Sequence, residues 1–88
     1  GTIETAYSIL NGEYEVIEAE IIETSELINK ELKNCDLPDE IRIGAVARGN
    51  DIIIPRSNFV FLKDDIVVFL AKRDQLPIVE NMFRISSI

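Results

Sequence analysis

The chain has 88 residues with nine basic and sixteen acidic side chains, which give a net charge of −7 at neutral pH. This length fits one domain, and the negative charge argues against binding to nucleic-acid backbones, which needs a dense Lys and Arg surface. The chain has no histidine and one cysteine, Cys35, so Ser-His and Cys-His catalysis are excluded and a zinc site is not expected. We therefore expect a protein that is not an enzyme.

Hydrophobic residues form 47% of the sequence, and β-branched isoleucine and valine are prominent among them. Such side chains favour a sheet-rich fold. No apolar run reaches the roughly 18–20 residues that span a bilayer, so no direct insertion into a membrane is expected. The lone cysteine leaves no internal disulfide, as in proteins of the reducing cytosol.

The first predicted strand covers residues 13–22, where polar and apolar side chains alternate. Residues 1–12 have weak periodicity and end at the turn pair Asn11-Gly12, so we interpret them as the tail of a preceding helix or a linker, and residues 13–88 as the folded domain. Five glutamates lie in or beside the strand: Glu13, Glu15, Glu18, Glu20 and Glu23. We interpret them as a solvated face; the alternative is a cation-binding cluster at a dimer axis.

A helix is predicted over residues 25–37. Ile28, Leu32 and Cys35 recur at helical spacing. Thr24 is suited to cap the first turn, and the residue before Pro38 is restricted to extended backbone, which ends the helix.

A β-hairpin follows. Residues 41–48 alternate, Gly49-Asn50 is a two-residue turn typical of hairpins, and residues 51–54 return as the second strand. Pro55 ends the hydrogen-bonding ladder.

The remaining elements are a strand and a helix. Residues 66–70 are consecutive apolar residues, which predicts a strand buried on both faces. Asp74 and Pro77 mark the start of the last helix, and Leu76, Val79 and Phe83 line one side of it. The order β-α-β-β-β-α predicts an α+β fold, a small, mainly antiparallel sheet with two helices.

The hairpin turn determines which side chains share a face. Arg48 should pair with Asp51, Ala47 with Ile52 and Val46 with Ile53. One face then carries the side chains expected in the core: Ala45, Ala47, Ile52 and Ile54. The opposite face carries an apolar floor edged by arginines, which suits a small anionic or nucleotide ligand.

We predict a ligand site on this second face, formed by Arg48, Asn50, Ile53, Pro55 and Arg56. Gly44, Val46 and Ile53 lie at the centre of the same face, which is also a candidate dimer contact or cleft. The alternative is that Arg48 forms a cross-strand ion pair with Asp51 while Arg42 and Arg56 are solvated.

A homodimer is expected because the central strands are apolar on both faces, whereas two short helices cover only one. Exposed apolar area costs about 25 cal/mol per Å², and a second copy about a two-fold axis is the simplest cover. Charge is also unevenly divided, with a net of −9 in residues 1–40 and +2 in residues 41–88. This division is either a solvated acidic face or a contact of the acidic half of one copy with the basic half of another.

Several segments resemble the C-terminal ligand-sensing domain of the regulator-of-K⁺-conductance family, usually called TrkA-C. The resemblance is carried by residues 43–55 (IGAVARGNDIIIP), by the acidic turn and strand at 64–69 (DDIVVF), and by 69–73 (FLAKR) with 78–83 (IVENMF). Residues 8–12 (SILNG) resemble the segment before this domain. The match covers most of residues 8–85.

The resemblance implies a cytoplasmic regulatory domain of a bacterial K⁺-uptake (Trk) system, held at the inner face of the membrane through a transporter subunit. It implies a dimer that senses a small anionic or nucleotide ligand in the cleft between two copies; the alternative is a structural dimerisation module without a ligand. NAD or ATP is implied only in Rossmann domains upstream, so no cofactor is expected in this domain.

Overall fold

The protein folds around a five-stranded antiparallel sheet whose strands lie in the order β1-β2-β5-β3-β4. The computed structural model describes the backbone of residues 3–83 and the side chains of residues 11–83. The elements are β1 (Ile3–Ile9), β2 (Tyr14–Glu20), β3 (Ile41–Arg48), β4 (Asp51–Ile53), β5 (Ile66–Lys72) and α1 (Leu76–Phe83), with short 3-10 helices at Leu10–Gly12, Leu32–Asn34 and Arg73–Gln75. The predicted α+β class with a mainly antiparallel sheet is confirmed.

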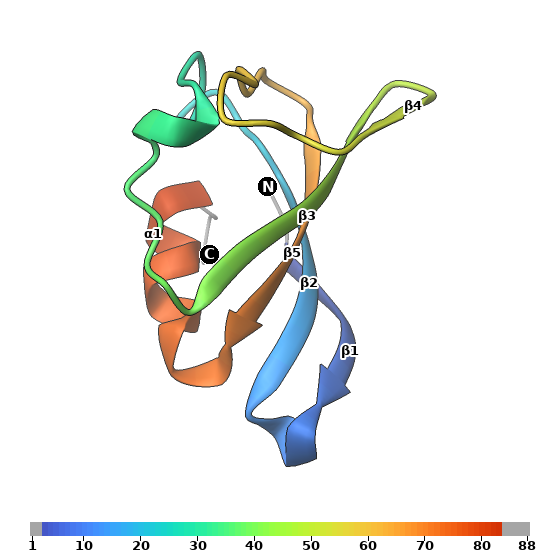
Figure 1. Cartoon of the computed structure of the whole chain (residues 1–88), viewed down its shortest axis with the longest axis vertical. Helices are drawn as coiled ribbons and strands as arrows, with labels where there is room; N and C mark the ends of the chain where they lie inside the picture. The colour runs from blue at the N-terminus through green and yellow to red at the C-terminus, as the bar shows by residue number, and fades with distance from the viewer. Residues whose placement is uncertain (1–2, 84–88) are drawn as a thin grey trace.

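One face of the sheet carries the hydrophobic core. Its buried side chains come from the three central strands: Ile17 and Ala19 of β2, Val67, Phe69 and Ala71 of β5, and Ile41 and Val46 of β3. Helix α1 covers this face (Figure 1), and the rings of Phe69 and Phe83 stack with centroids 5.3 Å apart. The buried Ser25 hydroxyl donates a 2.9 Å hydrogen bond to the Met82 carbonyl, which ties the segment after β2 to the last turn of α1.

The helix predicted over residues 25–37 is wrong. This segment forms turns and the short 3-10 helix Leu32–Asn34. Its backbone bonds to residues 57–61 instead: the N–H groups of Asn29 and Leu32 donate to the carbonyls of Phe61 and Phe59, both at 2.8 Å. Those N–H groups therefore cannot serve an α-helix, although the apolar side chains of the segment still pack against the core.

The sheet begins earlier than the sequence indicated. Residues 3–9 form β1, which pairs with β2 from Ile3 opposite Ala19 to Ile9 opposite Tyr14. The prediction placed these residues in the tail of a preceding helix or a linker. The domain's sheet therefore includes residues on the far side of the predicted boundary at residue 12.

Strand β3 contains a bulge at Gly44. Ile43 lies opposite Phe69 of β5 and Ala45 lies opposite Val68, so Gly44 is an extra residue on β3. An extra residue shifts the alternation of side chains by one. Ile41 and Val46 consequently both point into the core, with 2% and 0% of their surface exposed.

The other face of the sheet is open over the part of the chain that the structure describes. Figure 1 shows α1 and the long connections on one side of β2, β3 and β5, with the β3–β4 hairpin projecting beyond them. The prediction that residues 66–70 are buried on both faces is therefore half right. Val67 and Phe69 are buried in the core, whereas Ile66 on the open face is 38% exposed. None of the helices within residues 3–83 is long and apolar enough to cross a membrane.

Candidate functional site

The β3–β4 hairpin holds most of the residues predicted to bind a ligand. Its register is confirmed, since Arg48 lies opposite Asp51, Ala47 opposite Ile52 and Val46 opposite Ile53. Gly49 adopts a φ of 60° in the turn, a left-handed value that suits glycine. The turn residues therefore form the predicted hairpin.

The two faces of the hairpin are the reverse of the prediction. Val46, predicted at the centre of an outer cleft, is fully buried in the core, whereas Ile52 and Ile54, predicted in the core, are each 71% exposed. The cause is the bulge at Gly44, which moves the later part of β3 to the opposite phase. The exposed apolar surface of the hairpin is thus the face of Ile52 and Ile54.

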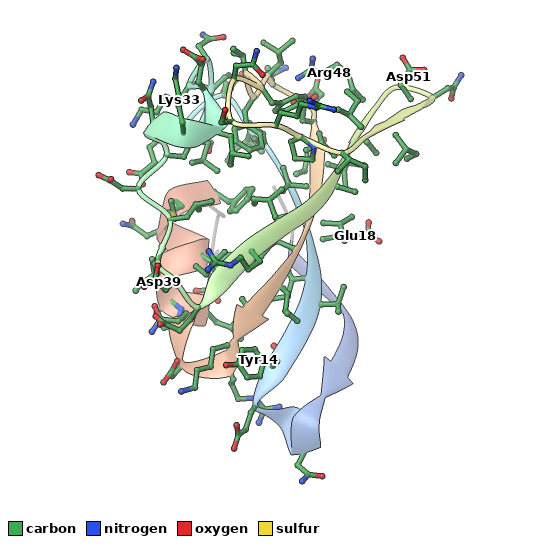
Figure 2. All side chains as sticks on the ribbon, viewed as in Figure 1. Tyr14, Glu18, Lys33, Asp39, Arg48 and Asp51 are labelled. Atoms are coloured by element: carbon green, nitrogen blue, oxygen red, sulfur yellow. The ribbon has the colours of Figure 1, made fainter. Side chains whose placement is uncertain are left out.

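Arg48 is held in a network with Asp65. Its Nε donates to Asp65 Oδ1 at 2.8 Å, and its Nη2 donates to Asp65 Oδ2 at 2.7 Å and to the Val60 carbonyl at 2.9 Å. The guanidinium carbon also lies 4.8 Å from the centre of the Phe59 ring. Asp65 Oδ2 accepts a further bond from the Leu62 N–H at 2.9 Å. The network fastens the hairpin to residues 59–65 through Arg48, which directly precedes the turn at Gly49-Asn50 and whose side chain is labelled in Figure 2.

The ion pair has a buried and a half-exposed partner. Asp65 has 1% of its side chain exposed, and Arg48 has 36%. The hydrogen bond to Asp65 raises the pKa of the Arg48 guanidinium. The predicted cross-strand pair with Asp51 is therefore wrong. The guanidinium is instead hydrogen-bonded to Asp65 and to the Val60 carbonyl.

From the sequence, Asp65 is expected only in the acidic turn at the start of residues 64–69. The one signal for its role was an aspartate directly before a buried strand, beside a hairpin that carries an arginine. Because the two partners are separated by 17 residues, no local pattern joins them.

The other predicted ligand residues are accessible. Asn50 and Arg56 are exposed, and Ile53 and Pro55 are half-buried. Gly44 is exposed at the bulge of β3. Apart from Arg48 and Val46, the predicted residues thus keep part of their surface exposed, although Ile53 lies opposite Val46 on the core side of the hairpin.

The open sheet face has an apolar centre and charged ends. Cross-strand neighbours form its centre: Val16, Leu70, Val68, Ala45, Ala47, Ile66 and Ile52. Glu18 and Glu20 lie toward the end of β2 that faces Ile66, and Glu18 points away from the helix in Figure 2. Lys72 lies at the opposite end of the same face, opposite Tyr14, and Arg42 lies opposite Leu70.

Glu15 departs from the predicted solvated acidic face. It is 7% exposed and lies opposite Ala71 on the core side of β2. Its Oε1 lies 3.4 Å from Arg73 Nη2, and its Oε2 has no hydrogen-bond partner among the residues that the structure describes. Among the described side chains, no group of three carboxylates or thiols is placed to hold a metal ion. The glutamates of β2 therefore divide between the two faces of the sheet.

Comparisons with known proteins agree on one family. The family model described as the TrkA-C domain matches residues 16–84. The chain is similar to the Trk system potassium uptake protein TrkA of Azorhizobium caulinodans, with 41% identity over 86 residues, or 98% of this chain and 19% of that protein. It is 31% identical over 91 residues to TrkA of Haemophilus influenzae, covering 99% of this chain and 20% of that protein.

An archaeal protein gives a similar result. The TrkA homolog of Archaeoglobus fulgidus is 34% identical over 64 residues, which cover 73% of this chain and 15% of that protein. The chain spans about one fifth of the length of the curated relatives it matches.

Proposed function

The chain belongs to the TrkA-C domain family, and from this premise we propose that it is a regulatory domain of a Trk potassium-uptake system. The support is the match over residues 16–84 together with relatives that are named potassium uptake proteins. In this proposal the domain acts in the cytoplasm, without catalysis, on a membrane K⁺-transporter subunit through the full-length protein.

The domain is proposed to work as a homodimer. The observation that carries this step is the open face of β2, β5 and β3, continued by the hairpin residues Ile52 and Ile54, which are each 71% exposed. Leaving such side chains in water costs about 25 cal/mol per Å² of apolar area. A second copy would remove this area from water about a two-fold axis.

Ile52→Asp is expected to convert the dimer into a monomer while leaving the fold intact. The side chain touches little in its own domain, so a carboxylate there remains solvated in the monomer but would be desolvated at a dimer contact. Sedimentation velocity at tens of micromolar should show twice the monomer mass for the wild type and the monomer mass for the variant. Ile78→Asp is the control, because Ile78 is 43% exposed on α1, away from this face. A wild-type protein that is monomeric at millimolar concentration would contradict the proposal.

A small anionic ligand is proposed to bind at the hairpin. The support is the exposed guanidinium of Arg56, which directly follows Pro55 and the half-buried Ile53. A planar guanidinium suits phosphate oxygens. Arg48 is no longer among the proposed ligand residues, because an anion would have to displace it from Asp65.

Chemical-shift mapping with mono- and dinucleotides tests this proposal. We expect shifts at residues 50–56 and at least about a tenfold loss of affinity for Arg56→Ala, since a charged hydrogen bond contributes about 1.5–3 kcal/mol. Arg42→Ala is the matched control and should bind as the wild type does. Shifts confined to residues 13–23 would place the ligand site on β2 and contradict a site at the hairpin. No shift at any concentration tried would leave the alternative function, a structural dimerisation module without a ligand.

A further inference from the structure

A surface cavity lies at the end of the sheet away from the β3–β4 hairpin. Its volume is about 450 Å³, and it is formed by the β1–β2 turn together with the residues that lead from β5 toward α1: Asn11, Gly12, Glu13, Lys72, Arg73 and Asp74. Figure 1 shows this turn and the hairpin at opposite ends of the molecule. Small-molecule pockets in proteins usually have about 300–1,000 Å³, so the cavity has the size of a site for a small ligand.

Arg73 is held against the β1–β2 turn. Its backbone N–H donates to the Glu13 carbonyl at 2.8 Å. Its guanidinium lies so close to Gly12 that a Cβ atom on this residue would be 3.2 Å from Nη2. Gly12 also has a φ of 87°, a value that suits glycine. The sequence of the turn therefore makes room for a guanidinium at the wall of the cavity.

A buried carboxylate with incomplete hydrogen bonding lies beside this guanidinium. Glu15 has 9% of its side chain exposed, and its Oε1 lies 3.4 Å from Arg73 Nη2, which is longer than the roughly 2.7–2.9 Å of a strong charged hydrogen bond. Its Oε2 has no partner among the described residues. A carboxylate removed from water needs hydrogen-bond donors, so Glu15 can still accept a donor from a ligand.

The side chains that line the cavity carry charges of both signs. Arg73 and Lys72 are basic, and Glu13 and Asp74 are acidic. Within the described part of the chain, Lys72 is in no ion pair, and the 63% exposed side chain of Arg73 has donors beyond its contact with Glu15. A simple anion would meet the two carboxylates, and a simple cation would meet the two basic groups. A ligand that carries both charges can satisfy both sets.

We propose that this cavity binds a small zwitterion of the α-amino-acid type. The Arg73 guanidinium turns from Glu15 toward the cavity and receives the ligand carboxylate, for which its planar pair of donors is suited. The ligand ammonium takes the place of the guanidinium at Glu15 and donates to its carboxylate oxygens. The long contact between Glu15 and Arg73 is thereby replaced by two sets of charged hydrogen bonds. This site is separate from the hairpin and goes beyond the proposed function.

Titration of the ¹⁵N-labelled protein with a panel of L-α-amino acids at millimolar concentrations tests the proposal. At least one amino acid should shift the amide signals of residues 11–15 and 72–74. Acetate and methylammonium, which each carry one of the two charges, should cause no shifts at the same concentration. The N-trimethyl derivative of the amino acid that binds keeps both charges but has no N–H donor, so it should bind at least about tenfold more weakly.

Two variants and their controls test the roles of the residues. Glu15→Gln and Arg73→Ala should each lower the affinity at least about tenfold, since each removes a charged hydrogen-bond partner of the ligand. Glu18→Gln and Arg42→Ala are the controls, at exposed positions that do not line the cavity, and both should bind as the wild type does. Circular dichroism checks the fold of each variant. If Glu15→Gln does not fold, Arg73→Ala decides alone, because that side chain is exposed.

Three results would overturn the inference. No shift at residues 11–15 or 72–74 with any amino acid tried would mean that the cavity is not a site for this class of ligand. Equal shifts with acetate would show a site for simple anions. An affinity unchanged in both variants would place the ligand elsewhere on the chain. None of these results bears on the dimer or on the hairpin ligand, which sedimentation and the nucleotide titration test separately.

Discussion

Replacing Arg48 by alanine is expected to lower the free energy of unfolding by about 2–4 kcal/mol. The loss follows from Asp65, whose carboxylate is 1% exposed and accepts two of its three hydrogen bonds from the guanidinium. The variant leaves a buried charge without its ion-pair partner. The expected loss of unfolding free energy is near the lower end of what is lost when one partner of a buried ion pair is removed. The reason is that Arg48 is itself 36% exposed, so water can reach part of the site.

Urea denaturation of the variant measures this loss. Arg42→Ala and Arg56→Ala are matched controls at exposed positions and should lie within about 0.5 kcal/mol of the wild type. Arg48→Lys should recover only part of the stability, since an ammonium lacks the planar pair of donors. An Arg48→Ala variant as stable as the controls would mean that the Asp65 pair does not fasten the hairpin.

Val46→Asp is expected to abolish folding, whereas Ile52→Asp leaves the fold unchanged. Val46 is fully buried among apolar side chains, and an unpaired carboxylate there costs several kcal/mol. That cost approaches the whole stability of a domain this size, which is about 4–13 kcal/mol at 0.05–0.15 kcal/mol per residue. Ile52 is 71% exposed, so the same substitution there desolvates no charge in the monomer.

Far-ultraviolet circular dichroism and thermal melting distinguish the two variants. We expect Val46→Asp to lack a cooperative transition and Ile52→Asp to melt in a single cooperative transition. The opposite result would restore the assignment of faces that simple alternation predicts. It would also mean that Gly44 does not form a bulge in solution.

The hairpin was predictable because its signals are local. Gly49-Asn50 supplies a turn with a positive φ at Gly49, and strand pairing then follows residue by residue from the turn. The final helix is similar, since its start at Leu76 lies two residues beyond Asp74 and beside Pro77. Short-range chemistry is sufficient for such elements.

The faces of the hairpin were not predictable in the same way. The alternation of residues 41–48 appears unbroken, and Gly44 is the only sign of a bulge. Whether a glycine in a strand forms a bulge depends on its neighbour strand, and β5 is more than twenty residues away in sequence. A shift of one residue then exchanged the core and solvent faces.

The prediction of a helix over residues 25–37 was wrong for a related reason. Its stripe of apolar side chains is real, but the N–H groups of Asn29 and Leu32 donate to residues 57–61. Hydrogen bonds to a distant segment took precedence over weak helix propensity. The same holds for Arg48: the sequence suggests its cross-strand neighbour Asp51 as the partner, whereas its guanidinium bonds to Asp65, 17 residues away.

That the helices leave apolar sheet residues uncovered did follow from the sequence. The apolar residues of β3 and β5 outnumber what the short α1 can bury, and the structure leaves Ile52, Ile54 and Ile66 exposed. What the sequence lacked was the arrangement of charge around this surface. That arrangement depends on strand order, which places Glu20 and Lys72 at opposite ends of one ladder.

The most direct test is a filtered nuclear Overhauser experiment on an equal mixture of ¹³C-labelled and unlabelled wild-type protein. If two copies meet through the open sheet face, contacts between labelled and unlabelled chains should involve the methyl groups of Val16, Val68 and Leu70. Val79 and Val67, which lie in the core, should show none. Intermolecular contacts confined to α1, or none at a concentration where sedimentation shows a dimer, would contradict the account.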